Sequence, residues 1–590
     1  MTPAESRGWP ADRGGHTFKK PPSRGALQKP CPAFGNRGMV RQRTSRYGAF
    51  MSTSLPAAIA PSPRAAGDGA REKMLGHASN ELVFGVVGHV GSGTSTVATQ
   101  IADQLRHAGG AGFDVEVIKA STLILRANEP KTTARPTGSI EHASHLQDLG
   151  DRMRIEREEP AAVAVAVVRE IQSRRKDKQG DAGDTEAGSL PDGTRRAWVV
   201  DSLRHPAEAE LLRHIYQDAF VLVGVVCQEN QREDRLREKF ENDGSKAKVQ
   251  KFMERDAKDG HSPLGQRVAD TFHMSDFFVD NTEDRDKDGL ANREWDVPDH
   301  LGRLVKIVTH SEIVRPTAAE TAMHVAYGAQ LRSACLSRQV GAALYSDDFS
   351  ALLSTGTNEV PRAGGGVYGL DRDGEHDHRC AFRADEARRF CSNTRHQVEL
   401  VKELVDTLSQ VSAEAGVELP RELVQLTLPD ALRRTRVGGL LEFSRAVHAE
   451  MDALLGAARS GTSTVGTRLF VTTFPCHYCA RHIVSAGVTE VQYIEPYPKS
   501  LALQLHDDAI AFAPQNSGGR VVFRPFCGVA PRLYRRAFLK DRDLKSNANG
   551  ALKIGQPEWG TPWHLRRVSY VTLESELLAE HQESGDAQDR

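Results

Sequence analysis

The sequence predicts an α/β protein with two successive domains, because strand-like and helix-like segments alternate in both halves of the chain. In the first half, apolar runs typical of buried strands occur at 81–87, 197–201 and 220–227, and helical patterns separate them. In the second half, the alternation returns between residues 445 and 496. Such alternation is typical of parallel sheets that are covered by helices.

The first domain is expected at 81–310. A glycine-rich turn follows its first strand, and a helix begins near Thr94. One long helical stretch is expected at 144–172, and the charged, Gly-rich segment 173–196 is interpreted as a surface insertion. The run 274–281 is expected to be the last strand of this sheet.

The second domain is expected at 311–576. A helical pattern leads into a strand at 340–346, and the run 350–358 is expected to pair with it as a hairpin. Residues 360–443 form a long insertion that includes a helical pattern. The tail at 577–590 is acidic and is expected to be flexible.

Composition excludes several classes of protein. The 590 residues carry 77 Lys and Arg against 78 Asp and Glu, which argues against a broad nucleic-acid surface. Apolar runs fall short of the roughly 18 residues that a membrane-spanning helix needs. The 8 cysteines fit a reducing compartment. Because the N-terminus lacks an apolar signal region, we expect a soluble, cytoplasmic protein.

Residues 1–80 are rich in Gly, Pro, Ser and Arg and lack periodicity, so we expect them to be disordered. A basic arm that binds nucleic acid is one interpretation of this segment. We favour the alternative that translation starts at Met51.

The strongest chemical signal is the combination of His448 with Cys476 and Cys479. One imidazole and two thiols are ligands that zinc prefers, and a catalytic zinc keeps its fourth position for water. Pro475 suits the first turn of a helix, whose N-terminus favours the thiolate form of nearby cysteines. A zinc knuckle or a redox pair is the alternative for an isolated Cys-x-x-Cys.

Glu450 lies two residues after His448 and is not needed as a ligand. A carboxylate beside a zinc-activated water can take its proton and pass it on. The pattern His-x-Glu followed by Pro-Cys-x-x-Cys is typical of zinc nucleobase deaminases. Glu450 is therefore the candidate proton shuttle.

Residues 318–500 resemble the CMP/dCMP-type deaminases in the segments "RSACLSRQVGAAL", "STGTNEVP", "HAEMDALL" and "TTFPCHYCARHIVSAGV". The resemblance implies a cytidine-deaminase-like α/β/α sandwich, zinc on His448, Cys476 and Cys479, and Glu450 as proton shuttle. It also implies that Asn358 contacts the substrate sugar, although Asn358 is also a common turn former. It further implies a homo-oligomer.

The insertion at 360–443 departs from the small members of that family. It leaves open how large a substrate the pocket accepts and how many phosphates that substrate carries. The insertion also contains a cluster that could hold a second, structural zinc, with a polar loop containing buried cysteines as the alternative: His376, His378, Cys380 and Cys391.

The segment Gly88–Ser95 follows a strand and opens a helix, which is the context of a P-loop. Its candidate nucleotide-binding residues are Gly88, Gly91, Ser92, Gly93, Thr94 and Ser95. Ser95 takes the Mg²⁺-binding position, but Thr94 replaces the usual lysine. Asp201 is the candidate acid at the end of a neighbouring strand. The loop could hold phosphates through backbone N–H groups, whereas tight packing alone is the other interpretation.

A P-loop NTPase/kinase-like domain followed by such a deaminase domain resembles the bacterial anti-phage dCTP/dCMP deaminases. That resemblance implies conversion of deoxycytidine nucleotides, dCMP or dCTP, to deoxyuridine nucleotides during infection. It also implies a nucleotide effector at the first domain and, for some members, inhibition by a small RNA. The alternatives are an RNA or single-stranded DNA deaminase, a housekeeping dCMP deaminase, and a nucleotide-sensing scaffold without catalysis.

Overall fold

The computed structural model describes residues 79–552 apart from several short gaps. These gaps are 109–111, 129–137, 180–183, 186–187, 190–193, 241–244, 258–263, 288, 370–376, 498–499, 513–516 and 540–544. The described residues belong to one compact unit, Gly67–Arg590. The expectations for 1–78, for Met51 and for the tail at 577–590 lie outside the described residues.

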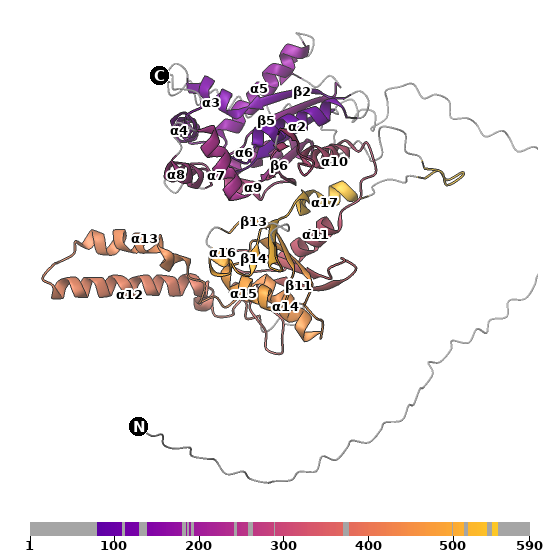
Figure 1. The fold of residues 1–590 in the computed structure, drawn as a ribbon. Coiled ribbons are helices and arrows are strands. Elements are labelled where there is room, and N and C mark those ends of the chain that lie inside the picture. Colours follow the sequence, from indigo (N-terminus) through magenta and orange to yellow (C-terminus); the bar gives the residue numbers. More distant parts are fainter. Residues whose placement is uncertain are drawn as a thin grey trace, which may run out of the picture. The chain divides into compact units, whose positions relative to one another are not determined.

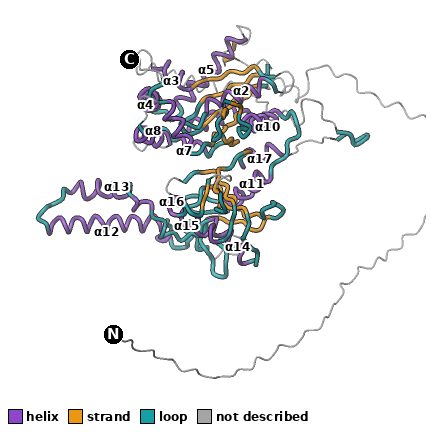
Figure 2. The backbone as a smooth tube through the Cα atoms, in the orientation of Figure 1, coloured by secondary structure: helices purple, strands orange, loops and turns teal. Residues whose placement is uncertain are grey.

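The first half of the chain builds a six-stranded sheet (Figures 1 and 2). Its main elements are β1 (Glu81–Val87), α2 (Thr94–Arg106), β2 (Asp114–Lys119), α3 (Ala120–Asn128), α4 (Ile140–Glu156), α5 (Ala162–Gln179), β5 (Arg196–Asp201), α6 (Pro206–Tyr216), β6 (Phe220–Val226), α7 (Glu229–Lys239), α8 (Lys246–Ala257), α9 (Val268–Phe272), β7 (Phe277–Asp280) and α10 (Val297–Thr309). Two short hairpins add β3 (Asp184–Thr185) with β4 (Gly188–Ser189) and β8 (Asp286–Lys287) with β9 (Leu290–Ala291).

The strand order of this sheet is β16-β7-β6-β1-β5-β2, in which β16 (Gly528–Val529) comes from the C-terminal part of the chain, and all neighbours except β16 and β7 run parallel. Strand β1 is buried along its whole length. Its alternate residues belong to two hydrophobic clusters, with α2 and α10 in one and α5 and α6 in the other. Burial on both faces explains why this strand reads as a continuous apolar run.

The second half builds another six-stranded sheet, in the order β11-β10-β12-β13-β15-β14. Its elements are α11 (Ala318–Gln330), β10 (Gly341–Tyr345), β11 (Leu352–Thr357), α12 (Ser392–Glu414), α13 (Leu428–Arg433), α14 (Ala449–Arg459), β12 (Arg468–Thr473), α15 (His477–Ser485), β13 (Glu490–Glu495), α16 (Ala502–Leu505), β14 (Ile510–Ala511), β15 (Val521–Pro525), β16 (Gly528–Val529) and α17 (Pro531–Phe538). Strand β10 is antiparallel to both β11 and β12, and the other pairs are parallel.

The structure confirms the predicted α/β class and the hairpin of β10 with β11, and it corrects two details. The helical stretch expected at 144–172 is two helices, α4 and α5, separated by residues that include Glu158 with φ 50° and Pro160. The strand expected to be last, β7, has a further neighbour, because β16 from the distant C-terminal part pairs with it. The domain boundary near residue 310 stays a prediction.

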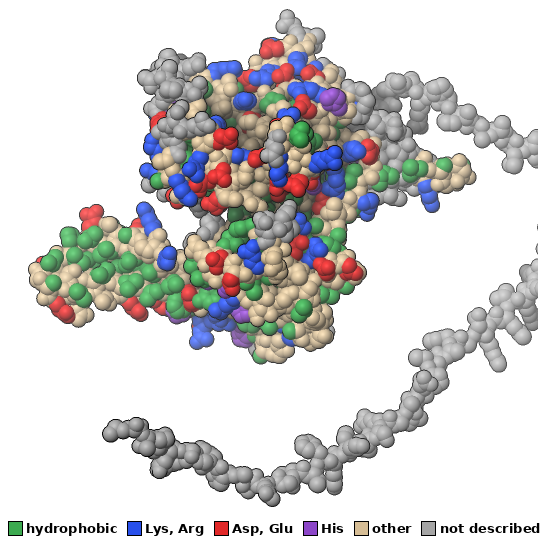
Figure 3. Space-filling view, in the orientation of Figure 1, with side chains coloured by type: hydrophobic (Ala, Val, Ile, Leu, Met, Phe, Trp, Pro, Cys, Tyr) green, Lys and Arg blue, Asp and Glu red, His purple; other side chains and the backbone are tan. Residues whose placement is uncertain are grey.

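The insertion at 360–443 carries the paired helices α12 and α13, which run side by side and extend from the second sheet (Figure 1). Apolar side chains are exposed on this arm (Figure 3). They include Val398, Leu408, Val411 and Leu426, whose exposed fractions are 41%, 44%, 57% and 64%. A helix pair of this kind leaves apolar surface in contact with water.

Candidate metal centre and catalytic cavity

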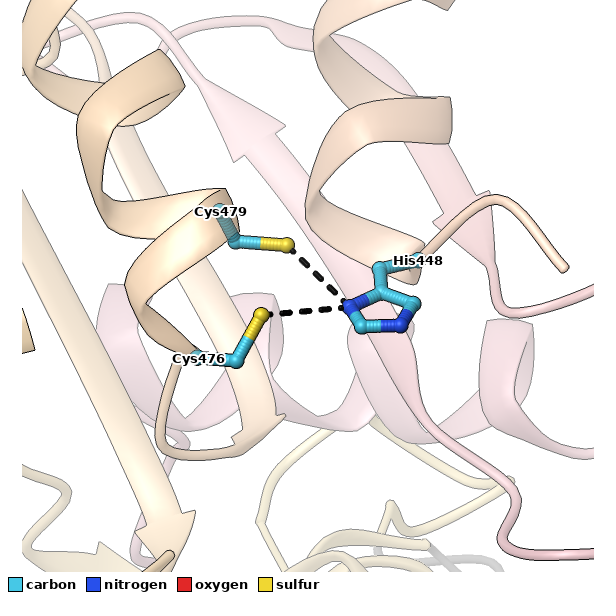
Figure 4. Close-up of side chains that lie close together, drawn as sticks. All are labelled: His448, Cys476 and Cys479. Atoms are coloured by element: carbon cyan, nitrogen blue, oxygen red, sulfur yellow. Dashed lines mark hydrogen bonds between the residues drawn. The ribbon is translucent and has the colours of Figure 1, made fainter. Parts of the chain in front are cut away.

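Two helix N-termini bring His448, Cys476 and Cys479 together. His448 is the N-cap residue of α14, and Cys476 is the N-cap residue of α15. Cys479 lies in the first turn of α15, so both sulfurs face the same side of that terminus (Figure 4). Pro475 was expected in the first helical turn, but it precedes the N-cap, because the helix begins at His477.

The three side chains form a compact set of potential ligands. Nδ1 of His448 lies 3.3 Å from Sγ of Cys476 and 3.4 Å from Sγ of Cys479 (Figure 4). All three ligand atoms lie within 4.8 Å of one another. One imidazole nitrogen and two sulfurs at this spacing fit a tetrahedral zinc site with an open fourth position. Within the described part of the chain, this is the one such group of three or more His, Cys, Asp or Glu.

The protonation of the three side chains is strongly coupled. Hydrogen bonding with Cys479, helped by His448, lowers the pKa of Cys476 to about 4. Hydrogen bonding with Cys476 raises the pKa of His448 to about 9. Hydrogen bonding with Cys476, together with burial, raises the pKa of Cys479 well above its ordinary value. A zinc ion at this site would require neutral His448 and both cysteines as thiolates, because metal ligands of these types bind in their deprotonated forms.

Glu450 lies in the first turn of α14, next to the ligand set. Its side chain is buried, with an exposed fraction of 4%. Burial, together with the nearby Cys476, raises the pKa of Glu450 to about 7. A carboxyl group whose pKa lies near neutrality can both accept and donate a proton, which suits general acid–base chemistry.

These residues line one cavity of about 360 Å³. The inserted segment supplies part of its wall, as its position in the sequence suggested. The lining includes His448, Glu450, Cys476, Asn358, Arg338, Tyr497, Thr473 and, from the insertion, Cys380, Cys391, Ser392, Asn393 and Leu441. The insertion therefore helps to determine the size and chemistry of this cavity.

Asn358 lines the same cavity, but its amide also supports the neighbouring loop. Its Oδ1 accepts a hydrogen bond of 2.7 Å from the N–H of Val340, and its Nδ2 donates one of 2.6 Å to the carbonyl of Arg338. The second N–H of the Asn358 amide is the donor that remains for a ligand. The expected sugar contact stays a prediction.

Sequence reasoning missed a polar group at the cavity wall. Arg338 lines the cavity and its Nη1 lies 3.2 Å from Oε2 of Glu495. The same Oε2 accepts a hydrogen bond of 2.8 Å from Oγ1 of Thr473. The pairing of β12 with β13 places Thr473 opposite Glu495, and Arg338 reaches them from the segment before β10, so no local sequence pattern indicated that the three side chains meet.

The proposed second zinc cluster does not form a ligand group among the described residues. His376 lies outside them. Cys380 and Cys391 line the cavity that contains His448 and Glu450, and Sγ of Cys391 lies 3.2 Å from Oγ of Ser337. A second zinc stays a prediction.

The glycine loop lies between β1 and α2, as the sequence indicated. Gly91 and Gly93 have φ of 83° and 82°, which L-residues rarely adopt, and Gly93 is the N-cap of α2. Oγ of Ser95 donates a hydrogen bond of 2.6 Å to Oδ2 of Asp201 at the end of β5. Gly88, Ser92 and Thr94 complete the loop. This arrangement lies at the carboxyl ends of parallel strands, where ligands commonly bind.

Comparison with known protein families finds a match in the second half of the chain. Residues 316–495 match the model of the cytidine and deoxycytidylate deaminase zinc-binding region. The matched residues include His448, Glu450, Cys476, Cys479 and Asn358. The match to a zinc-binding family agrees with the ligand set that the structure assembles.

Curated relatives match parts of the chain. Deoxycytidylate deaminase of Enterobacteria phage T4 is 28% identical over 184 residues, which cover 31% of this chain and 80% of that protein. ComE operon protein 2 of Bacillus subtilis (strain 168) is 41% identical over 54 residues. The match covers 9% of this chain and only 29% of that relative's length.

The comparison with solved structures gives a dCMP deaminase from the cyanophage S-TIM5 in apo form. It is 19% identical with a TM-score of 0.20, and the match covers 36% of this chain and 100% of that chain. The same cyanophage protein in complex with dCMP and dUMP gives the same identity of 19% and TM-score of 0.20, with 36% and 99% covered.

A search of the described helices finds none that is both long enough and apolar enough to cross a membrane.

Proposed function

We propose that the chain is a zinc-dependent enzyme that hydrolyses deoxycytidine nucleotides, dCMP or dCTP, to deoxyuridine nucleotides and ammonia. The observation that carries the proposal is that the ligand cluster of His448, Cys476 and Cys479 opens, through His448 and Cys476, onto the cavity that Glu450 also lines. The match of residues 316–495 to the deaminase zinc-binding region supports it.

In the proposed reaction, His448, Cys476 and Cys479 hold the zinc. A zinc ion held by these residues would acidify a water molecule for attack on carbon 4 of the cytosine ring. Glu450 would accept the proton of that water and deliver it to the ring nitrogen N3. It would then take the proton of the new hydroxyl group on carbon 4 and pass it to the amino group, which leaves as ammonia.

The cavity also offers groups for the rest of a nucleotide. Arg338 and Arg445 line it, and both can contact a phosphate. Asn358 is the proposed partner of the sugar. Whether the enzyme prefers dCMP or dCTP depends on how much room the insertion at 360–443 leaves for phosphates near Arg338 and Arg445.

Replacement of Glu450 by Gln tests the catalytic proposal. The variant should keep stoichiometric zinc and lose deamination of dCMP and dCTP by a factor of roughly a hundred or more, because its amide cannot shuttle protons. Metal content and ammonia release are the measurements. Glu403→Gln, an exposed change on α12, is the matched control and should leave both unchanged. A Glu450→Gln enzyme with wild-type turnover would refute the assignment.

The alternative substrates are RNA and single-stranded DNA, since the same chemistry acts on flipped bases. The rate of deamination of labelled oligonucleotides, compared with the rate for mononucleotides, decides between these substrate classes.

A housekeeping role in dTTP supply remains the alternative to anti-phage depletion of deoxycytidine nucleotides. Nucleotide pools measured in infected cells, with wild-type enzyme and Glu450→Gln, distinguish these two roles.

We further propose that the glycine loop binds a nucleotide effector, with Mg²⁺ near Ser95 and Asp201. The hydrogen bond between these two side chains supports it. The small RNA inhibitor is a second proposal, supported only by the family resemblance. Deamination assayed with each effector, and with RNA transcribed from the neighbouring locus, tests both.

Finally, we propose that the chain forms homo-oligomers through the α12–α13 arm, with a second copy as the partner. The arm exposes apolar side chains near Leu408 and Val411. Its tip is acidic and its return segment is basic, so two arms in antiparallel orientation place opposite charges together. The charges are Glu414, Glu418 and Glu422 at the tip, and Arg433, Arg434 and Arg436 on the return.

The oligomer proposal predicts that Leu408→Glu with Val411→Glu lowers the mass measured by sedimentation velocity, because buried charge opposes the association. Lys402→Glu, an exposed change on the same helix, is the control. A double variant with an unchanged mass would exclude this interface.

A further inference from the structure

A second cavity, of about 680 Å³, lies between the glycine loop and the second sheet. His89 of the loop and Arg232 of α7 form part of one wall. Tyr493 of β13, Phe512 and Arg520 form part of the other. Its wall thus combines aromatic rings, cationic groups, the acidic residues Glu229 and Asp507 and a segment of the loop, a mixture of apolar and polar groups that small-molecule sites use.

Arg232 is the unusual residue of this cavity. Its Nε is buried and has no hydrogen-bond partner. Across the described chain, its guanidinium forms no ion pair, whereas Arg235, one turn along the helix, bonds to Asp284 and to the carbonyl of Asn281. Burial lowers the pKa of Arg232, with partial compensation by Glu229 at longer range. A largely buried cation without a partner is costly, and an anionic ligand would remove that cost.

The backbone of Arg232 lies against the glycine loop. A Cβ atom placed on Gly91 would come within 2.7 Å of the Arg232 carbonyl oxygen, so any larger residue at this position would displace α7. The loop itself has no lysine or arginine, because Thr94 stands at the lysine position. Arg204 donates a hydrogen bond of 3.2 Å to the carbonyl of Gly88 but is paired with Asp256. Among the described residues, Arg232 is therefore the unpaired cation beside this loop.

We propose that this cavity binds a nucleoside phosphate, with Arg232 as the partner of a phosphate group and the aromatic wall facing the nucleoside. The inference deepens the proposed nucleotide binding by the glycine loop and rests on it. Guanidinium–phosphate pairs are strong and directional, which suits an otherwise unpaired arginine. Phe512 and Tyr493 offer ring surfaces for a base.

Strand β13 connects this cavity to the cavity that contains His448 and Glu450. Tyr493 lies on β13, two residues before Glu495. Glu495 accepts the hydrogen bond from Thr473 and pairs with Arg338, and both of these residues line the catalytic cavity. A ligand against Tyr493 therefore contacts the strand that holds this wall, so its binding can alter deamination.

Calorimetric titration of the full zinc-loaded chain with Mg-ATP, dTTP and inorganic tripolyphosphate tests the inference, since none of these is a deamination substrate. Arg232→Gln should weaken the binding of all three roughly tenfold to a hundredfold, as expected for the loss of a charged hydrogen bond. Arg237→Gln, an exposed change on the same helix, is the matched control and should stay within about twofold. Phe512→Ala should weaken ATP and dTTP but not tripolyphosphate.

Thermal unfolding separates a binding role from a structural one. Because Arg232 has no partner in the free protein, Arg232→Gln should keep or raise the ligand-free Tm, whereas loss of a structural contact would lower it. Equal affinities for wild type and Arg232→Gln, or equal losses in Arg232→Gln and Arg237→Gln, would overturn the inference. If Ser95→Ala weakens Mg-ATP but Arg232→Gln does not, the loop binds nucleotide and only this inference fails. Basal dCMP deamination, assayed without effector, decides the catalytic proposal separately.

Discussion

His448 and Cys476 occupy equivalent positions, because each is the residue that caps the N-terminus of a helix. The partial positive charge of a helix N-terminus lowers the energy of a thiolate, which is the form that binds metal. Cys479 follows one turn later and is buried, with an exposed fraction of 1%. At the scale of single residues, the two helix N-termini hold the nitrogen and sulfur ligand atoms close together and favour the thiolate form of the cysteines.

The residue-scale prediction concerns metal retention. Cys479→Ser should lower the zinc content well below one ion per chain, because a hydroxyl is a poor zinc ligand compared with a thiolate. Elemental analysis after dialysis against a weak chelator measures it. Cys335→Ser is the control, since Cys335 lines the same cavity outside the ligand set. Full zinc occupancy in Cys479→Ser would contradict the assigned ligands.

At the scale of elements, helix α14, which carries His448 and Glu450, packs on strand β11 at very short range. A Cβ atom on Gly356 would lie 2.0 Å from the carbonyl oxygen of Ala449 and 2.4 Å from the amide nitrogen of Ala453. Glycine is therefore required for this approach rather than for a turn. The strand fixes the depth at which α14 presents His448 and Glu450.

Gly356→Ala should push α14 away from the sheet and lower kcat/KM for dCMP by more than roughly tenfold, with a loss of stability of about 1–3 kcal/mol from overpacking. Steady-state kinetics and urea unfolding measure the two effects. Gly328→Ala in α11 is the control, because a Cβ atom there meets nothing within 4 Å. A Gly356→Ala enzyme that matches this control would show that the contact does not position the site.

At the scale of the whole molecule, Glu320 joins the two halves of the chain. It caps α11 through Thr317 and accepts hydrogen bonds of 2.6 and 2.7 Å from Arg303 of α10. It also accepts a hydrogen bond of 2.7 Å from the N–H of Val529 in β16, the strand that joins the first sheet. One buried carboxylate thus connects α10, α11 and the C-terminal strand.

Removal of this carboxylate should be costly. Glu320→Ala is expected to lower the free energy of unfolding by about 3–5 kcal/mol, because it leaves Arg303 and a buried N–H unpaired. Glu312→Ala removes the exposed pair with Lys306 and should cost at most about 1 kcal/mol. Denaturant unfolding of both variants gives the comparison, and similar losses would argue against a connecting role for Glu320.

The sequence by itself determined the strands of both sheets that read as apolar runs, and it identified His448, Cys476, Cys479 and Glu450. These signals are local, because burial on both faces gives continuous apolar runs and metal ligands cluster at helix starts. Only the tertiary structure decided that β16 completes the first sheet, that Arg338 and Glu495 meet at the cavity wall, and that Arg232 lies unpaired beside the glycine loop. Each of these three contacts joins segments that are far apart along the chain. Such contacts depend on tertiary packing, which local sequence patterns do not specify.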